Sequence, residues 1–94
     1  MNAIFDQRAS VPEDVMIRDV AGESVLLNLN TETYFGLDDV GTRMWHALQQ
    51  AGTIRQAYDT LISEYDVAPD TLRDDLLKLI KELSEHGLLA LHDA

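Results

Sequence analysis

The spacing of apolar residues along this chain changes once, close to residue 37, from every second residue to every third or fourth. Before that point lie three short runs rich in β-forming residues, at 15–20, 24–29 and 33–37. Apolar residues at every second position are typical of strands, and the short connections favour antiparallel neighbours. All strands therefore precede all helices, which excludes the alternating order of a doubly wound α/β fold.

The second run has two distinct faces, and the third run has two possible places in the sheet. Val25, Leu27 and Leu29 share one face of the second run, with Ser24 and Asn28 on the other face. The third run, residues 33–37, is either an interior strand or an exposed edge that could accept another chain by β-augmentation.

Three helices are expected in the second part of the chain. Their ends carry recognisable signals: Asp38 and Gly52 for the first, Thr53 and Gln56 (a capping box) for the second, and Pro69 and His86-Gly87 for the third. A three-stranded antiparallel meander followed by three helices predicts an α+β domain of the winged helix-turn-helix type. The apolar residues 88–91 that follow are either a further strand or a packing strap.

Ninety-four residues are enough for one small domain with one core. Residues 1–14 are polar and follow neither period, so we expect a flexible N-terminal arm before a domain at 15–94. The N-terminus lacks the basic and apolar regions of a signal peptide, and the apolar runs are far too short to cross a membrane. With no cysteine in the chain, we expect a cytoplasmic protein.

The charge balance disfavours nucleic acid and membrane surfaces as partners. Seven basic and seventeen acidic side chains give a net charge of −10, which repels phosphate groups. The third expected helix, which would enter the major groove in a DNA-binding relative of this fold, has three cations against five carboxylates. The cations are Arg73, Lys78 and Lys81.

The residues also indicate no catalytic or metal site. Without cysteine there is no thiolate nucleophile or cysteine-based zinc site. His46, His86 and His92 are not spaced for shared ligation, and no glycine-rich phosphate loop is present. The adjacent carboxylates at 38–39 and 74–75 diverge by about 100° on a helix, so neither pair converges on one atom. We expect a binding module with no cofactor and no metal.

A helical projection singles out Leu77 in the third helix. With Leu72 at 0°, the main apolar residues fall between about −20° and +80°, whereas Leu77 falls at about 140°, between Arg73 and Lys81. Leu77 either closes the edge of a wide core face or forms the lip of a peptide-binding groove.

From about residue 15 to 91 the sequence resembles the PqqD-like family, the precursor-peptide recognition elements of ribosomally made, modified peptides. The densest likeness runs from Val25 to Trp45. Further matching positions are Thr53, Ala57, Leu61, Tyr65, Val67, Leu72, Asp75, Leu76, Leu83 and Gly87-Leu88-Leu89.

The resemblance implies a winged helix-turn-helix domain without catalytic activity. Such a domain binds the leader segment of a precursor peptide as an added strand and presents it to a maturation enzyme. That partner is a radical-SAM enzyme in pyrroloquinoline quinone biosynthesis, or a leader peptidase and a cyclase in lasso-peptide pathways. Quinone-pathway members more often carry a Pro-Glu pair between the second and third strands. This chain has Asn30-Thr31-Glu32 there, which favours a lasso-type or related pathway.

The peptide-binding positions implied are the third strand and one face of the third helix. The resemblance fixes the two elements, and the helical projection selects the residues on the helix. The candidates are Thr33, Tyr34, Phe35, Gly36, Leu37, Arg73, Leu77, Ile80 and Lys81. Two alternative functions remain at this point, an acidic winged-helix transcription regulator and a structural subunit of a larger enzyme.

Overall fold

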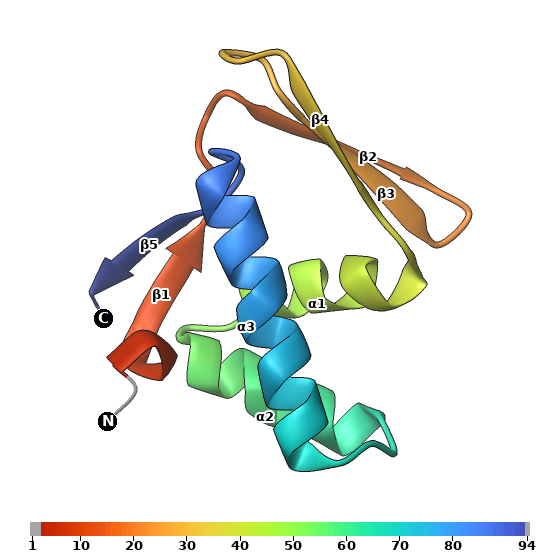
Figure 1. Ribbon diagram of the computed structural model, residues 1–94, viewed down its shortest axis with the longest axis vertical. Coiled ribbons are helices and arrows are strands. Elements are labelled where there is room, and N and C mark those ends of the chain that lie inside the picture. Colours follow the sequence, from red (N-terminus) through yellow and green to blue (C-terminus); the bar gives the residue numbers. More distant parts are fainter. Residues whose placement is uncertain (1–2, 94) are drawn as a thin grey trace.

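The computed structural model describes residues 3–93, so positions 1, 2 and 94 of the expected arm and domain lie outside it. Its elements are η1 (Ala3–Asp6), β1 (Gln7–Ser10), β2 (Val15–Val20), β3 (Glu23–Asn28), β4 (Thr33–Leu37), α1 (Asp39–Gln50), α2 (Ile54–Glu64), α3 (Pro69–Glu85) and β5 (Ala90–Asp93). Figure 1 shows the sheet of β2, β3 and β4 at one end, above α1, with α3 running lengthwise through the middle of the view. The predicted α+β order, three antiparallel strands followed by three helices, is confirmed.

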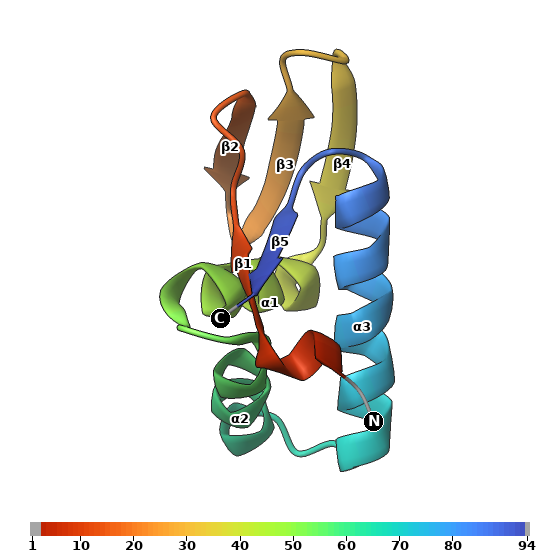
Figure 2. The same ribbon diagram turned by 90° about the vertical axis from the view of Figure 1, so that its left-hand side faces the viewer.

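The three central strands form an antiparallel meander in the order β2-β3-β4. In Figure 2 they stand side by side, and β4 is the strand nearest α3. The β2–β3 connection is a two-residue turn in which Ala21 and Gly22 both have positive φ, at 53° and 86°. Two such residues match the tight hairpin turn whose twist suits the flanking strands.

The two faces of β3 are the reverse of what its apolar pattern suggests. Ser24, Leu26 and Asn28 are buried toward the helices, whereas Val25 is 42% exposed. The buried polar groups have partners that the local sequence does not reveal. Ser24 Oγ hydrogen-bonds Thr42 Oγ1 of α1, so the hydroxyl is not left unsatisfied in the core.

The helix starts form as their sequences predict. The Asp38 carboxylate accepts a hydrogen bond from the Gly41 N–H at 2.7 Å, and Thr53 with Gln56 completes a capping box. Pro69 occupies the first turn of α3. The end of α1 differs from expectation, because the helix is capped by Ala51 in an extended conformation and Gly52 only follows it.

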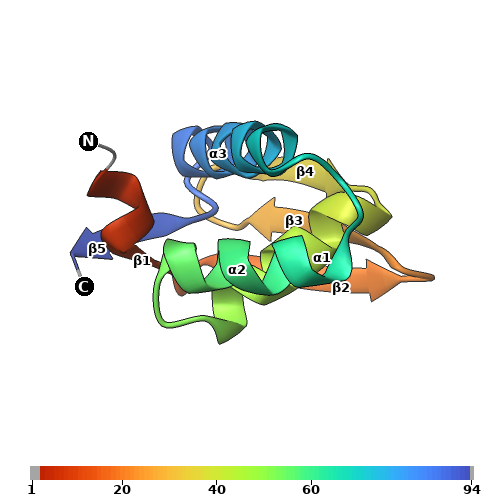
Figure 3. The same ribbon diagram turned by 90° about the horizontal axis from the view of Figure 1, so that it is seen from below.

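One core joins the sheet to all three helices. α3 contributes Leu72, Leu76, Ile80 and Leu83, and Trp45 of α1 is fully buried. The remaining buried apolar residues are Phe5, Leu26, Leu37, Met44, Ala47, Leu48, Ile54, Ala57, Leu61, Leu88 and Leu89. Seen from below, in Figure 3, α3 lies against the β4 side of the molecule and α2 against the other side.

The N-terminal segment differs from the expected flexible arm. Residues 3–10 form η1 and β1, and β1 pairs antiparallel with β5, the apolar tail of the chain. Phe5 is 8% exposed, and its ring packs edge-on against Tyr58 at 5.9 Å between centroids. This pairing joins residues eighty or more positions apart, so no local period of the sequence predicts it.

One exposed ion pair ties α1 to α2. Arg43 Nε donates to Glu64 Oε2 at 2.8 Å. This hydrogen bond lowers the pKa of Glu64 below its ordinary value and raises the pKa of Arg43. No helix within residues 3–93 is long and apolar enough to span a membrane.

Candidate peptide-binding site

β4 is an edge strand. Within the described residues it pairs only with β3, and its other edge lies beside α3 (Figures 2 and 3). An edge strand presents unpaired N–H and C=O groups, which can bind an additional strand. Of the two readings of residues 33–37, the structure therefore supports the exposed edge.

The side chains of β4 point alternately to the two faces of the sheet. Thr33, Phe35 and Leu37 face the helices, while Tyr34 and Gly36 face away from them. Phe35 is half-buried, and its ring lies 5.4 Å from the imidazole of His86 at the end of α3. This contact identifies the flank of α3 that faces β4.

A groove opens where β4 ends, between the start of α1 and the same flank of α3. We call it the α1–α3 groove, and its volume is about 250 Å³. Its lining is apolar at Val40, Met44 and Leu79 and charged at its rim. The complete lining is Asp38, Val40, Gly41, Met44, Asp75, Lys78, Leu79 and Glu82. Three carboxylates against one ammonium favour a ligand that carries positive charge near this end of β4.

The α3 positions predicted from the projection do not lie on this flank. Taking about 100° per residue, Asp75, Leu79 and Glu82 fall within roughly 40° of His86 around the helix. Leu77 falls about 180° from His86, and the other three predicted positions, Arg73, Ile80 and Lys81, fall roughly 120–140° away. The structure thus brings Thr33–Leu37 together with the flank that carries Leu79 and His86.

The surroundings of Ile80, Leu77 and Arg73 agree with this placement on α3. Ile80 is 0% exposed in the core, and Leu77 is partly buried against it. Arg73 lies near carboxylates of its own helix, 3.8 Å from Asp70 and 3.6 Å from Asp74. The helical projection places Leu77 at one border of the apolar face of α3. It does not show which border of that face lies toward the sheet.

Asn28 is a positioning residue that the sequence reading missed. Its side-chain Nδ2 donates to the carbonyl of Gly87 at 3.0 Å and lies 3.4 Å from that of His86. Its Oδ1 accepts from the N–H groups of Asn30 and Thr31. One buried amide therefore fixes the end of α3 against the β3–β4 connection, and so sets the position of His86 beside Phe35.

Gly87 permits this close approach. It has a φ of +68°, and a Cβ at this position would lie 2.8 Å from Asn28 Nδ2. A side chain here would be strained and would push Asn28 away. The His86-Gly87 helix end predicted from sequence is thus also a contact point between α3 and the sheet.

The three histidines lie in separate environments. His46 Nε2 lies 3.8 Å from the carboxylate of Asp19. His86 Nδ1 lies 2.7 Å from the carbonyl oxygen of Glu82, one turn earlier in α3. His92 forms a hydrogen bond with Ser10. Over residues 3–93 no three metal-ligating side chains come together. What the site offers is a strand edge, an aromatic contact and a groove with an apolar floor, all of which suit an extended peptide.

Comparisons with known proteins identify a family and two solved structures with a similar fold. Residues 23–89 match the family described as coenzyme PQQ synthesis protein D (PqqD). The solved structure of TbiB1 in complex with the TbiA(beta) leader peptide is similar to this chain, with 35% identity, a TM-score of 0.77, and coverage of 84% of this chain and 92% of TbiB1. No curated protein sequence matches the chain.

A second solved structure is a lasso peptide synthetase B1 complexed with its leader peptide. It has a TM-score of 0.78, covers 88% of this chain and 98% of its own, and is 20% identical, so it supports the fold alone. The family match spans β3 through Leu89, which includes the β4 edge, α3 and the groove between α1 and α3. Sequence match and fold together place this chain in the PqqD family.

Proposed function

We propose that this protein is a non-catalytic peptide chaperone. It binds the leader segment of a ribosomally made precursor peptide and presents that peptide to a maturation enzyme. The observation that carries the proposal is the free edge of β4 beside a half-buried aromatic residue and an apolar groove. A relative of 35% identity that was solved with a leader peptide supports it.

The leader adds as a fourth strand to β4. Its backbone pairs with the open edge, which supplies affinity, and alternate side chains enter the space between the sheet and α3. Those side chains meet Phe35 and His86, and at the end of β4 the peptide reaches the apolar floor of the α1–α3 groove. The acidic rim of the groove favours basic residues in this part of the leader.

The chemistry of peptide modification belongs, in this proposal, to the partner enzyme. The residues of the site bind, align and orient, because the site is built from a strand edge and apolar side chains. We assign the chain to a lasso-type or related peptide pathway, since its β3–β4 connection reads Asn30-Thr31-Glu32 without the Pro-Glu pair more common in quinone-pathway members.

Two leucines on opposite sides of α3 test the proposal. The Leu79→Asp variant places a carboxylate in the apolar floor of the groove, and we expect its affinity for the TbiA(beta) leader peptide to fall by about thirtyfold, as for an interface hot spot of roughly 2 kcal/mol. The matched Leu77→Asp variant changes the far side of the helix and is expected to bind like wild type. Titration calorimetry measures both affinities.

Circular dichroism shows whether each variant is folded. Should Leu79→Asp fail to fold, Val40→Asp takes its place, because Val40 lines the same groove and is 41% exposed. The proposal is contradicted if folded wild-type protein does not bind the leader. Weaker binding by folded Leu77→Asp, with Leu79→Asp unaffected, would move the site to the other flank of α3.

A further inference from the structure

The face of the sheet that points away from the helices carries several exposed apolar side chains. Met16 and Val20 of β2 are 55% and 59% exposed, and Tyr34 of β4 is 70% exposed. The strand register places Val25 and Leu27 of β3 on this same face, opposite Arg18 and Met16. We call this surface the outer face.

Gly36 is the one β4 position on the outer face without a side chain, and nothing in the chain itself requires a glycine there. Its φ lies outside the left-handed region, and a Cβ built on it would meet no atom within 4 Å. Glycine weakens a strand because it loses more backbone entropy on folding than other residues and has no side chain to pack. A glycine inside a strand often marks a place where another backbone or a ligand approaches closely.

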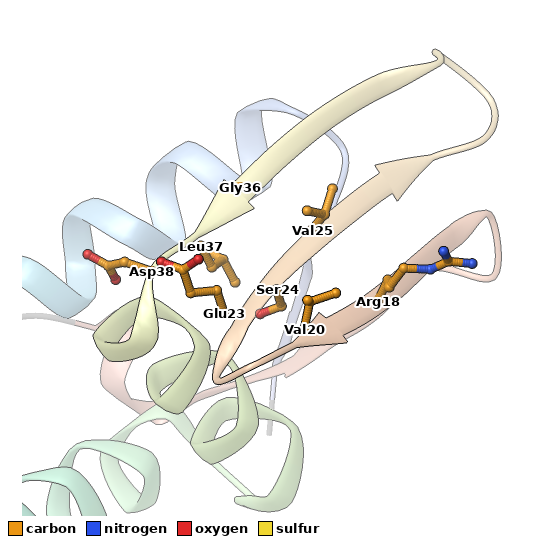
Figure 4. Close-up of a pocket in the computed structure, with 8 residues that line it drawn as sticks. All are labelled: Arg18, Val20, Glu23, Ser24, Val25, Gly36, Leu37 and Asp38. Carbon is orange, nitrogen blue, oxygen red and sulfur yellow. The ribbon is translucent and has the colours of Figure 1, made fainter.

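A hollow of about 350 Å³ lies around Gly36 on the outer face. Figure 4 shows it, with Val25 on β3, Val20 and Arg18 on β2, and Leu37 and Asp38 at the end of β4. Val25 is the direct neighbour of Gly36 across the strand pair. Its exposed side chain therefore borders the space that the missing Gly36 side chain leaves open.

A strand added to β4 would have one residue opposite Gly36 on this face, whatever its direction. Cross-strand neighbours share a face, and neighbouring strands lie only about 4.8 Å apart. A short side chain at that position stays above its own strand, whereas an aromatic ring extends across the glycine to the next strand. Packing an aromatic side chain over a glycine in the neighbouring strand is a known way to stabilise a sheet edge.

We propose that the bound leader peptide lays an aromatic side chain across Gly36, into the hollow and against Val25. This inference rests on the proposed function, and it adds a recognition element on the face opposite α3. The leader is then read on both sides of the sheet: by the groove and Phe35 on the inner face, and by the Gly36 hollow on the outer face. Tyr34, two positions away on the same face, borders the ring on one side.

The Gly36→Val variant tests this inference. The added side chain occupies the part of the hollow directly over position 36. A β-branched residue also suits a strand, so the thermal midpoint should stay the same or rise. Affinity for the TbiA(beta) leader peptide should fall at least about tenfold, because the ring loses its place. The control is Met16→Thr, which removes apolar surface from the same face on the far strand and is expected to leave leader affinity unchanged.

Nuclear magnetic resonance of the wild-type complex gives a second, independent readout. A ring stacked on Gly36 should move the resonances of its Hα protons upfield, while those of Gly22, in the β2–β3 turn, stay in place. A leader peptide in which every aromatic residue is replaced by leucine should lose both the upfield shift and most of its affinity.

The outcomes separate this inference from the proposed function. If wild type and Gly36→Val bind the leader equally, the outer-face contact is wrong and leader binding itself stands. If the leucine-substituted leader binds as tightly as the original, the aromatic contact is likewise wrong. If wild type does not bind the leader at all, the proposed function fails, and the outer-face inference with it.

Discussion

Replacing Leu76 by aspartate is expected to unfold this protein at room temperature. Leu76 is 0% exposed in the middle of α3 and faces the core. Burying a carboxylate there and losing the apolar contacts costs about 5 kcal/mol or more, which is comparable to the whole stability of a small domain. Circular dichroism at 222 nm should show the loss of helix without heating.

The neighbouring substitution, Leu77→Asp, is the contrast. Leu77 is only partly buried at the edge of the core, and we expect a cost of about 1 kcal/mol, typical of a point mutation. The variant should unfold cooperatively a few degrees below wild type. Equal loss of structure in both variants would show that Leu77 is as much a part of the core as Leu76.

Removing the Asn28 side chain is expected to cost about 3 kcal/mol, through the lost hydrogen bonds and the buried groups left without partners. Asn28 is 6% exposed and joins the end of α3 to the β3–β4 connection. Urea denaturation of the Asn28→Ala variant measures the change in the free energy of unfolding. The variant should also bind leader peptide more weakly, since His86 is no longer fixed beside Phe35.

Asn30→Ala is the matched control for Asn28→Ala. Asn30 lies exposed in the same connection, and only its backbone N–H takes part in the Asn28 network. Its replacement should change the unfolding free energy by less than about 0.5 kcal/mol. If the two variants are equally stable, Asn28 does not hold α3 against the sheet.

The features that could be predicted from the sequence are those that local residues determine. The order of strands and helices follows from the period of the apolar residues. The starts of α1 and α2 follow from Asp38 and from Thr53 with Gln56, because a cap bonds to groups only two or three residues away. Residues 33–37 were predicted as a strand on the same local grounds, but the resemblance to the PqqD-like family, not the local pattern, selected this strand as a candidate site.

The features that were missed depend on contacts between distant residues. Ser24 and Asn28 are buried because Thr42 and the end of α3 supply their hydrogen-bond partners. β1 exists because the C-terminal strand pairs with it. The helix projection singled out Leu77 because it lies outside the main apolar sector. A projection of one helix does not show which flank meets the sheet, whereas the contact of His86 with Phe35 does.

The central claim, that the leader peptide adds a strand to β4, is tested most directly by hydrogen exchange. Amide exchange is measured in the free protein and in the presence of saturating TbiA(beta) leader peptide. A strand paired with the open edge covers the outward N–H groups of Thr33–Leu37, so exchange in β4 should slow markedly, with smaller changes in β2, at the opposite edge of the sheet. Protection confined to α1 and α2, or to β2, with β4 exchanging as in the free protein, would contradict the account.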